Sequence, residues 1–181
     1  MQEQAQAILA DLSDAEPDGT VTVSSGALAV ASPGNTQYAK VLARPVAPGS
    51  YPAFIHQSDQ EFDAVPTVGV DGVLVRFADR PVATWEEART ADDEPLIEAS
   101  DVIGLCFGDA ETFSSDESLG EETQSTLDDV CTDDGVGEVE GKAVVVYIGE
   151  VAIEHRMYCG LDDAGELVAL VGAFRYPGDD E

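Results

Sequence analysis

Basic residues are scarce in this sequence. The 181 residues include 8 lysines and arginines against 37 aspartates and glutamates, which gives a formal net charge of −29 at pH 7. Two of the basic residues are lysines, Lys40 and Lys142. Proteins that bind nucleic acid directly gather cations on one face, because those cations release the counterions of the phosphates. The composition therefore argues against direct nucleic-acid binding.

The excess of acid has three interpretations. In molar salt the Debye length falls to roughly 3 Å, so the repulsion among many carboxylates is screened while they keep the surface hydrated. Acidic side chains can instead imitate a nucleic-acid backbone for a basic partner, or form a terminal interaction tail. The acids run from Glu3 to Glu181 and form no terminal block. This distribution favours adaptation to a high-salt environment in a halophilic source, with an acidic nucleic-acid mimic as an alternative.

Cysteine pairs and long apolar runs are missing too. The three cysteines, Cys106, Cys131 and Cys159, lie far apart and form no CxxC motif, so neither a disulfide framework nor a zinc site is expected. The acidic stretch at 128–138 lacks the spacing of a calcium loop. No apolar run approaches the ~18 residues of a spanning helix, and the sequence opens on a polar segment. We expect no metal, no cofactor and no membrane span, and a cytoplasmic protein, or one in a virion if the chain is a subunit of a viral shell.

Catalytic motifs are also absent. The sequence has no phosphate-binding glycine loop, no GxSxG and no HExxH. It has two histidines, His56 and His155, and a Cys106–His155 pair would need hydrogen-bond contact that nothing in the sequence predicts. Acid clusters at 92–94 and 128–129 indicate solvated surface in a chain this acidic. We name no catalytic residue and expect no enzyme, with an enzyme of unrecognised type as an alternative.

What is present indicates a single β-rich domain over residues 1–181. Apolar residues on one face predict a helix at 2–12, within an N-terminal helix and turn at 1–18. Short alternating or apolar segments bounded by turn residues predict antiparallel strands. They lie at 20–23, 27–31, 38–43, 51–56, 73–77, 102–107, 143–148 and 151–157, with a hairpin between the first two and a closing hairpin at 156–174.

Residues 108–141 predict an acidic insertion, with a helix at 118–131 and a loop at 132–141. The fold class is therefore mainly β: an antiparallel sandwich or partly open barrel with an N-terminal helix and one short helical insertion.

One stretch of the chain has no acid at all. No Asp or Glu occurs between Gly19 and Ser58, whereas 17 of the 37 acids lie at 91–140. Either these strands are central in the fold, or one face of the segment contacts another protein, where unpaired carboxylates would be costly. The second interpretation predicts an oligomer or assembly subunit. Its candidate interface residues are Thr22, Thr36, Gln37, Tyr38 and Lys40.

A cluster around the single tryptophan is the other candidate site. It contains Arg76, Arg80, Trp85 and Glu86. The arginines can pair with Asp79 or Glu86 over the indole ring, which would be structural, or they can hold an anion such as a carboxylate. Both readings remain open from the sequence.

The stretch VRFADRPVATWEEA at 75–88 resembles the central motif of the domain-of-unknown-function family numbered 4241. Other segments are similar to that family in the same order: 25–33, the PGSYP turn at 48–52, 104–111, and the hairpin at 160–174. The run DVIGLCF at 101–107 departs from the family, which has a fuller GVDxGTGCF-like run there. The resemblance implies a β-rich fold and supplies no catalytic residue, because the family has no established activity.

These observations predict a non-catalytic protein-interaction or assembly protein. Its partner would be another protein or a second copy of the chain. A structural subunit of a larger assembly, such as a viral shell, is an alternative within the same class.

Overall fold

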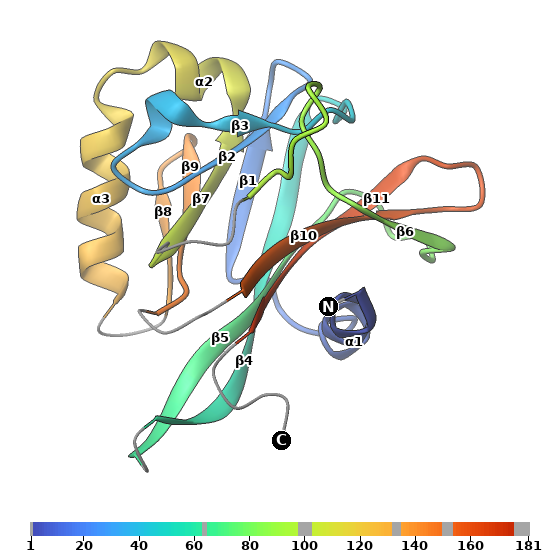
Figure 1. Cartoon of the computed structure of the whole chain (residues 1–181). Coiled ribbons are helices and arrows are strands. Elements are labelled where there is room, and N and C mark those ends of the chain that lie inside the picture. The colour runs from blue at the N-terminus through green and yellow to red at the C-terminus, as the bar shows by residue number, and fades with distance from the viewer. Residues whose placement is uncertain (1, 63–64, 98–102, 132–134, 150–153, 176–181) are drawn as a thin grey trace.

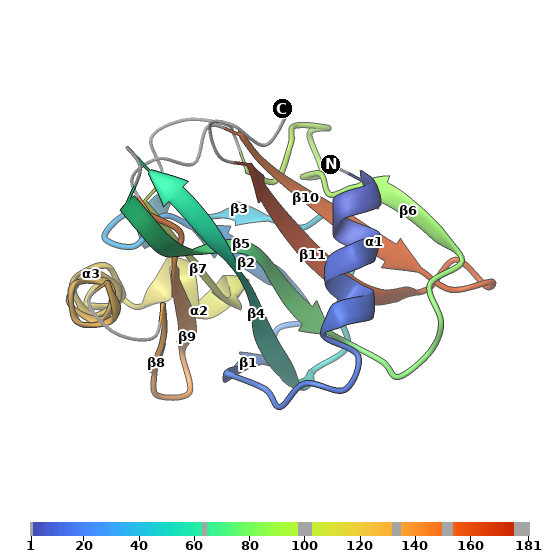
Figure 2. The ribbon, with the colours of Figure 1, turned by 90° about the horizontal axis from the view of Figure 1, so that it is seen from below.

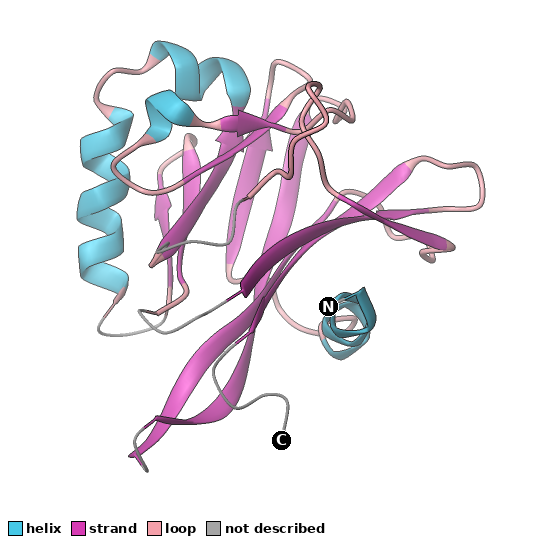
Figure 3. Cartoon of the chain, viewed as in Figure 1, coloured by secondary structure: helices cyan, strands magenta, loops and turns pink. Residues whose placement is uncertain are grey.

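A computed structural model describes residues 2–62, 65–97, 103–131, 135–149 and 154–175. Two antiparallel sheets make up most of it (Figures 1 and 3). The six-stranded sheet contains, from edge to edge, β1 (Gly19–Val23), β4 (Gly49–Phe62), β5 (Val65–Arg76), β11 (Leu167–Arg175), β10 (Glu154–Leu161) and β6 (Thr84–Glu87). The five-stranded sheet contains β3 (Lys40–Val41), β2 (Leu28–Ala31), β7 (Gly104–Asp109), β9 (Ala143–Tyr147) and β8 (Val136–Val139).

The predicted fold class is confirmed: the chain is mainly β and antiparallel, with an N-terminal helix and a short helical insertion. The helices are α1 (Gln2–Asp11), the 3-10 turn η1 (Thr36–Tyr38), α2 (Ala110–Ser115) and α3 (Leu119–Val130). The two sheets are open and share one core, to which both contribute buried valines and leucines. Helix α1 covers the outer face of the six-stranded sheet, and α3 covers that of the five-stranded sheet (Figures 1 and 2).

The predicted N-terminal helix is confirmed. Ala5, Ile8 and Leu12 are buried against the six-stranded sheet, and Leu9 packs at the margin of the same cluster. Beneath the helix, β5 has Gly72, where any side chain would collide with Ile8. A glycine at this position therefore lets the helix lie close to the sheet.

The closing hairpin is confirmed as well. Strands β10 and β11 pair along their lengths. In the turn between them, the Asp162 carboxylate accepts hydrogen bonds from the backbone N–H groups of Ala164 and Glu166, both at 2.9 Å. Gly165 has a φ of 77°, a conformation that glycine adopts without strain.

The prediction of a hairpin between 20–23 and 27–31 is wrong. Strand β1 pairs with β4 in one sheet, whereas β2 pairs with β3 and β7 in the other. The chain therefore changes sheets across residues 24–27. Asp109 is the physical reason, because its carboxylate accepts hydrogen bonds from the N–H groups of Ser24 and Ser25, at 2.8 and 2.7 Å, which a hairpin turn would use internally.

Other strand boundaries differ from the prediction. Residues 36–38 form η1, so the strand predicted at 38–43 is reduced to β3. The hairpin of β4 and β5 is far longer than the predicted 51–56 and 73–77, because backbone pairing continues through the polar residues 57–62 of β4 and the mixed residues 65–72 of β5. The prediction of a loop at 132–141 is wrong at β8, which pairs with β9, while 132–134 lie outside the described residues. Val102, in the predicted strand 102–107, and residues 151–153, in the predicted strand 151–157, also lie outside the described residues.

Candidate functional site

Every basic residue of the chain has a polar partner. The two lysines and five of the six arginines form ion pairs with carboxylates, and Arg76 bonds to backbone carbonyls. Lys142, for example, bridges Asp116 at 2.8 Å and Glu122 at 2.9 Å. Its hydrogen bond to Asp116, together with those from Ser118, lowers the pKa of Asp116 to about 2. The few cations that this acidic chain retains are therefore used to connect its elements.

Arg76 holds the end of α1 onto the sheet. Its Nη2 donates to the carbonyl of Leu12 at 2.8 Å, and its guanidinium carbon lies 4.8 Å from the centre of the Phe54 ring. A cation at the C-terminus of a helix meets the unpaired carbonyls there and the negative end of the helix dipole. The sequence left a structural role and an anion-binding role open for Arg76, and the structure gives it the structural one. Its partners are the Leu12 carbonyl and the Phe54 ring in place of Asp79 or Glu86.

The predicted cluster of Arg76, Arg80, Trp85 and Glu86 does not form one site. Arg80 pairs with Asp162 at 2.5 Å and Glu166 at 2.8 Å, across the β10–β11 turn. Glu86 pairs with Arg44, whose hydrogen bond lowers the pKa of that carboxyl.

The indole of Trp85 packs with Val82 at the margin of the core beneath α1. Arg76 and Arg80 do border one pocket of about 200 Å³, together with Asp79. Their charged ends are committed to other partners, so this pocket offers no free cation for an anion.

The five predicted interface residues fall in two places. Thr22 lies on β1, where its hydroxyl is 3.3 Å from that of Ser50 on β4. Thr36, Gln37, Tyr38 and Lys40 lie in η1 and β3, at the edge of the other sheet. Thr36 is 3% exposed and so cannot be part of a surface.

Part of the acid-free segment is internal. All four residues of β2 are buried, and β1 buries alternate residues in the shared core. Burial accounts for the missing acids at these positions, although β1 is an edge strand. The exposed part of the segment includes the surface around η1 and β3.

An exposed apolar patch lies on that surface, and we call it the β3 patch (Tyr38, Lys40 and Val41). The side chain of Tyr38 is 76% exposed and that of Val41 is 40% exposed, and among the described residues Ile103 is the other large exposed hydrophobic side chain. In the described part of the fold, β3 is an edge strand with β2 on one side. Sequence reasoning missed Val41, although the alternation with buried Leu42 was the available signal.

Lys40 connects the β3 patch to the segment 88–97. Its ammonium lies 3.4 Å from Glu94 and donates to the carbonyl of Pro95 at 3.3 Å. The N–H of Ala43 donates to the carbonyl of Arg89 at 2.8 Å. The segment 88–97 is thereby held beside β3.

A small pocket of about 160 Å³ lies on the other side of this segment, next to β10. We call it the His155 pocket. Its lining combines three residues that can carry charge or form hydrogen bonds, Glu87, His155 and Arg156, with five apolar ones. The apolar residues are Ala88, Pro95, Leu96, Ile97 and Met157. It borders the part of β10 that β6 does not cover, because the paired register of these strands ends at Tyr158 and Glu87.

His155 is the unusual member of this lining. Its side chain is 3% exposed, and neither ring nitrogen has a hydrogen-bond partner. The ring meets Phe174 edge-on, with 5.6 Å between the ring centres. Burial lowers the pKa of His155 below its ordinary value, so the neutral imidazole is favoured.

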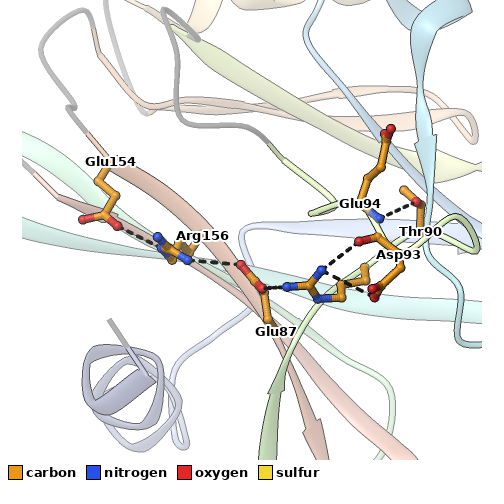
Figure 4. A network of polar contacts seen from close by, with 7 residues as sticks. Glu87, Thr90, Asp93, Glu94, Glu154 and Arg156 are labelled. Atoms are coloured by element: carbon orange, nitrogen blue, oxygen red, sulfur yellow. Dashed lines mark hydrogen bonds and ion pairs between the residues drawn. The ribbon is translucent and has the colours of Figure 1, made fainter.

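A chain of ion pairs joins β10, β6 and the segment 88–97 (Figure 4). Two of its members, Glu87 and Arg156, border the His155 pocket. Arg156 donates to Glu154 at 2.8 Å and to Glu87 at 3.2 Å. Glu87 also accepts a hydrogen bond from Arg89, which reaches the backbone carbonyl of Asp93 at 2.7 Å. The carboxylate of Glu87 is thus held between two guanidinium groups.

The structure does not bring the hypothetical Cys106–His155 pair together. Cys106 lies on β7 in the cluster beneath α2 and α3, whereas His155 lies on β10 in the other sheet. Burial raises the pKa of the Cys106 thiol to about 12, which makes it inert as a nucleophile near neutral pH. The same cause raises the pKa of Cys159 to about 12.

His56 has a different setting from that of His155. Its Nδ1 lies 2.5 Å from Asp71, and its Nε2 lies 3.3 Å from Asp11 at the end of α1. Within the described ranges, no group of three or more His, Cys, Asp or Glu side chains is arranged to hold a metal ion. No helix among those residues is long and apolar enough to cross a membrane.

Comparison with protein-family models, with curated proteins and with solved structures finds no match to this chain. The resemblance to the 4241 family rests on the sequence motifs alone. Two of those motifs meet in space, since Asp109 of the segment 104–111 bonds to the amide of Ser25.

Proposed function

We propose that this chain is a non-catalytic protein-interaction module that associates with a second copy of itself through the β3 patch. The observation that carries the proposal is the exposure of Tyr38 and Val41 close together at an edge strand. Exposed aromatic and aliphatic groups beside the free edge of a strand are a common basis for protein association.

Charge favours a second copy as the occupant. Each chain has a net charge of −29, so two copies approach most easily where carboxylates are absent or already paired. Residues 20–57, which contain the β3 patch, have no acid, and in the segment 88–97 beside it Glu94 is paired with Lys40 and Asp93 with Arg89. Antiparallel pairing of β3 with its counterpart would satisfy a twofold axis, the commonest symmetry of homo-oligomers.

A high-salt cytoplasm is the setting that fits this proposal, because salt screens the remaining repulsion between the copies. Repeated self-association would also suit a subunit of a larger assembly such as a viral shell. The proposed class of function is the same in both cases.

Light scattering in about 3 M KCl measures the mass directly. We expect a dimer for the natural chain and a monomer for Val41→Asp and Tyr38→Asp, because a carboxylate at the contact would be buried without a partner. Ile103→Asp is the matched control, because Ile103 has a similar exposed fraction but lies away from the β3 patch. It precedes the first residue of β7, whereas β3 lies level with the last residues of that strand. Circular dichroism checks that each variant is folded.

A monomeric natural chain would overturn the proposal of self-association. So would a dimer that Val41→Asp leaves intact. Thr22→Asp adds a test of the other sheet: loss of the dimer in this variant alone would place the contact at β1 and contradict the β3 patch.

A further inference from the structure

The His155 pocket carries a second inference, independent of self-association. Natural proteins keep few buried polar groups without a hydrogen-bond partner, because such a group loses its bonds to water and gains none in return. Both ring nitrogens of His155 are in this condition, although the ring borders a pocket. A group bound in this pocket would give one nitrogen the partner that it lacks.

The alternation of β10 decides which side chains can share a ligand with His155. Successive residues of a strand point to opposite faces of the sheet. The His155 ring meets Phe174 in the core that the two sheets share, and Met157 belongs to the same core. Arg156 lies on the other face of β10, where it bonds to Glu87. The charged residues of the lining are therefore paired with each other and do not face the imidazole.

Met157 brings a second electron-pair donor to the same face of β10. Met157 is 2% exposed and His155 is 3% exposed, and both border the pocket. Alternate residues of a strand have Cα atoms about 6.6–6.8 Å apart, so two long side chains on one face can bind a single ion between them. The ring torsion of histidine is broad, and a small rotation can direct a nitrogen towards that ion. The other uncharged residues of the lining are apolar: Ala88, Pro95, Leu96 and Ile97.

The chemistry of the two donors selects the ion. A neutral imidazole offers the lone pair of one nitrogen, and a thioether offers its sulfur. Thioether sulfur is a soft ligand that favours Cu(I), and imidazole binds copper as well. Zinc and calcium sites use larger sets of thiolates, imidazoles or carboxylates, and within the described ranges no group of three or more such side chains is placed to hold an ion. The net charge of −29 favours a cation as the ligand.

We propose that the His155 pocket binds a soft monovalent metal ion, Cu(I), between a ring nitrogen of His155 and the sulfur of Met157. Both ligands are neutral, so the bound site keeps the single positive charge of the ion. The ion is bound and released with no change of oxidation state. Apolar neighbours such as Leu96 and Ile97 limit the access of water to it.

Titration with Ag(I) tests the proposal, because Ag(I) has the charge and the ligand preference of Cu(I) and is not oxidised by air. Potassium sulfate replaces KCl, since chloride precipitates silver. Every sample carries Cys131→Ser, because the exposed thiol of Cys131 would bind the same ion, whereas the other two cysteines are buried.

Nuclear magnetic resonance locates the ion directly. The chain has two methionines and two histidines, so labelled methionine methyl groups and histidine rings give two sets of signals each. We expect the Met157 methyl and the His155 ring signals to move together and to saturate near one equivalent of Ag(I). The signals of Met1 and His56 are internal controls, and they should respond only at higher concentrations. Zn²⁺ at the same concentration should move neither signal of the site.

Two variants test each ligand separately. His155→Phe keeps the ring contact with Phe174 but removes both nitrogens, and Met157→Leu replaces the thioether with an alkyl group of similar volume. In each variant we expect the signal of the remaining ligand to need at least tenfold more Ag(I) for half-saturation. Cys159→Ala is the matched control, because Cys159 is a buried sulfur residue two positions further along the same face of β10 and does not border the pocket. Circular dichroism checks that each variant is folded.

Signals of Met157 and His155 that stay unchanged at one equivalent of Ag(I) would overturn the proposal. An unchanged Met157 response in His155→Phe would also overturn it, because the ion would then need no imidazole. Loss of the response in Cys159→Ala would place the ion at the thiol, and an equal response to Zn²⁺ would contradict a soft-ion site. The β3 patch variants should bind Ag(I) normally, so a failure of either proposal can be told from a failure of the other.

Discussion

The carboxylate of Asp109 accepts a hydrogen bond from the backbone N–H of Ser25 at 2.7 Å. The same carboxylate accepts from Ser24 at 2.8 Å and from the first turn of α2, where the N–H groups of Glu111 and Thr112 donate at 3.1 and 3.2 Å. One side chain thus fixes both the crossing between the sheets and the start of a helix. Burial alone would raise the pKa of Asp109, but these donors hold it at about 2.

Asp109→Asn should lower the free energy of unfolding by about 2–3 kcal/mol, because the amide NH₂ would face backbone donors in place of an acceptor. Urea unfolding at constant KCl and neutral pH measures the change. Glu117→Gln is the control, since Glu117 is exposed on the surface and carries the same charge. An equal, small effect of both substitutions would contradict the role of Asp109.

Arg76→Gln should detach the end of α1, because glutamine cannot both reach the Leu12 carbonyl and cover the Phe54 ring. The expected loss of unfolding free energy is about 1–2 kcal/mol. Hydrogen exchange should become faster in residues 2–12 and stay unchanged in the five-stranded sheet. Arg80→Gln, which removes an exposed ion pair, should do neither. Unchanged exchange in α1 would show that the packing of Ile8 and Leu12 is sufficient by itself.

His155 should make the protein less stable as the pH falls below about 6.5. The unfolded chain takes up a proton at this histidine near its ordinary pKa of 6.5, whereas burial lowers the pKa in the folded chain. Its contribution to stability is therefore complete above 6.5 and declines towards the lower, folded-state pKa, with a slope of at most about 1.4 kcal/mol per pH unit.

Urea unfolding between pH 7.5 and 5.5 measures this slope. His155→Phe should flatten it, whereas His56→Gln should retain the part that belongs to His155. Parallel curves for the natural chain and His155→Phe would contradict the prediction.

Potassium chloride should stabilise the fold strongly. Between about 0.1 and 1 M salt the Debye length falls from about 10 to 3 Å, so repulsion among the carboxylates fades. The midpoint temperature should rise throughout this range and beyond. A variant with Glu117→Gln and Glu121→Gln should need less salt for the same midpoint. A midpoint that stays flat or falls with KCl would argue against adaptation to salt and in favour of another role for the acids.

The pattern of residues predicted the elements whose signal is local. Helix α1 has a continuous apolar face, and the β10–β11 hairpin has a turn with its own Asp and Gly, so neighbouring residues specify both. The crossing between sheets could not be predicted, because Ser24 and Ser25 depend on Asp109, which lies more than eighty residues away in the chain. The length of β4 and β5 was missed for a similar reason: the polar extension of β4 is specified by its pairing with β5 rather than by apolar alternation.

Whether a residue of the candidate sites could be predicted also depended on whether its signal was local in the sequence. Tyr38 and Lys40 were accessible to sequence reasoning through the absence of acids, but the burial of Thr36 and the exposure of Val41 depend on how η1 precedes β3. The ion pairs of Glu87 join segments that are distant in sequence, and nothing local indicated them. The small number of arginines, six, was a usable signal, because a cation retained in so acidic a chain is expected to have a specific partner.

The crossing at residues 24–27 has a consequence for how the molecule unfolds. Strands β1 and β2 belong to different sheets and are joined by a few residues whose amides Asp109 holds, so neither sheet can separate without pulling on the other. The two sheets should then melt in one cooperative transition, despite the separate helices that cover them. The amides of Ser24 and Ser25 would exchange with solvent only when the whole chain opens, which makes this short connection a reporter of global stability.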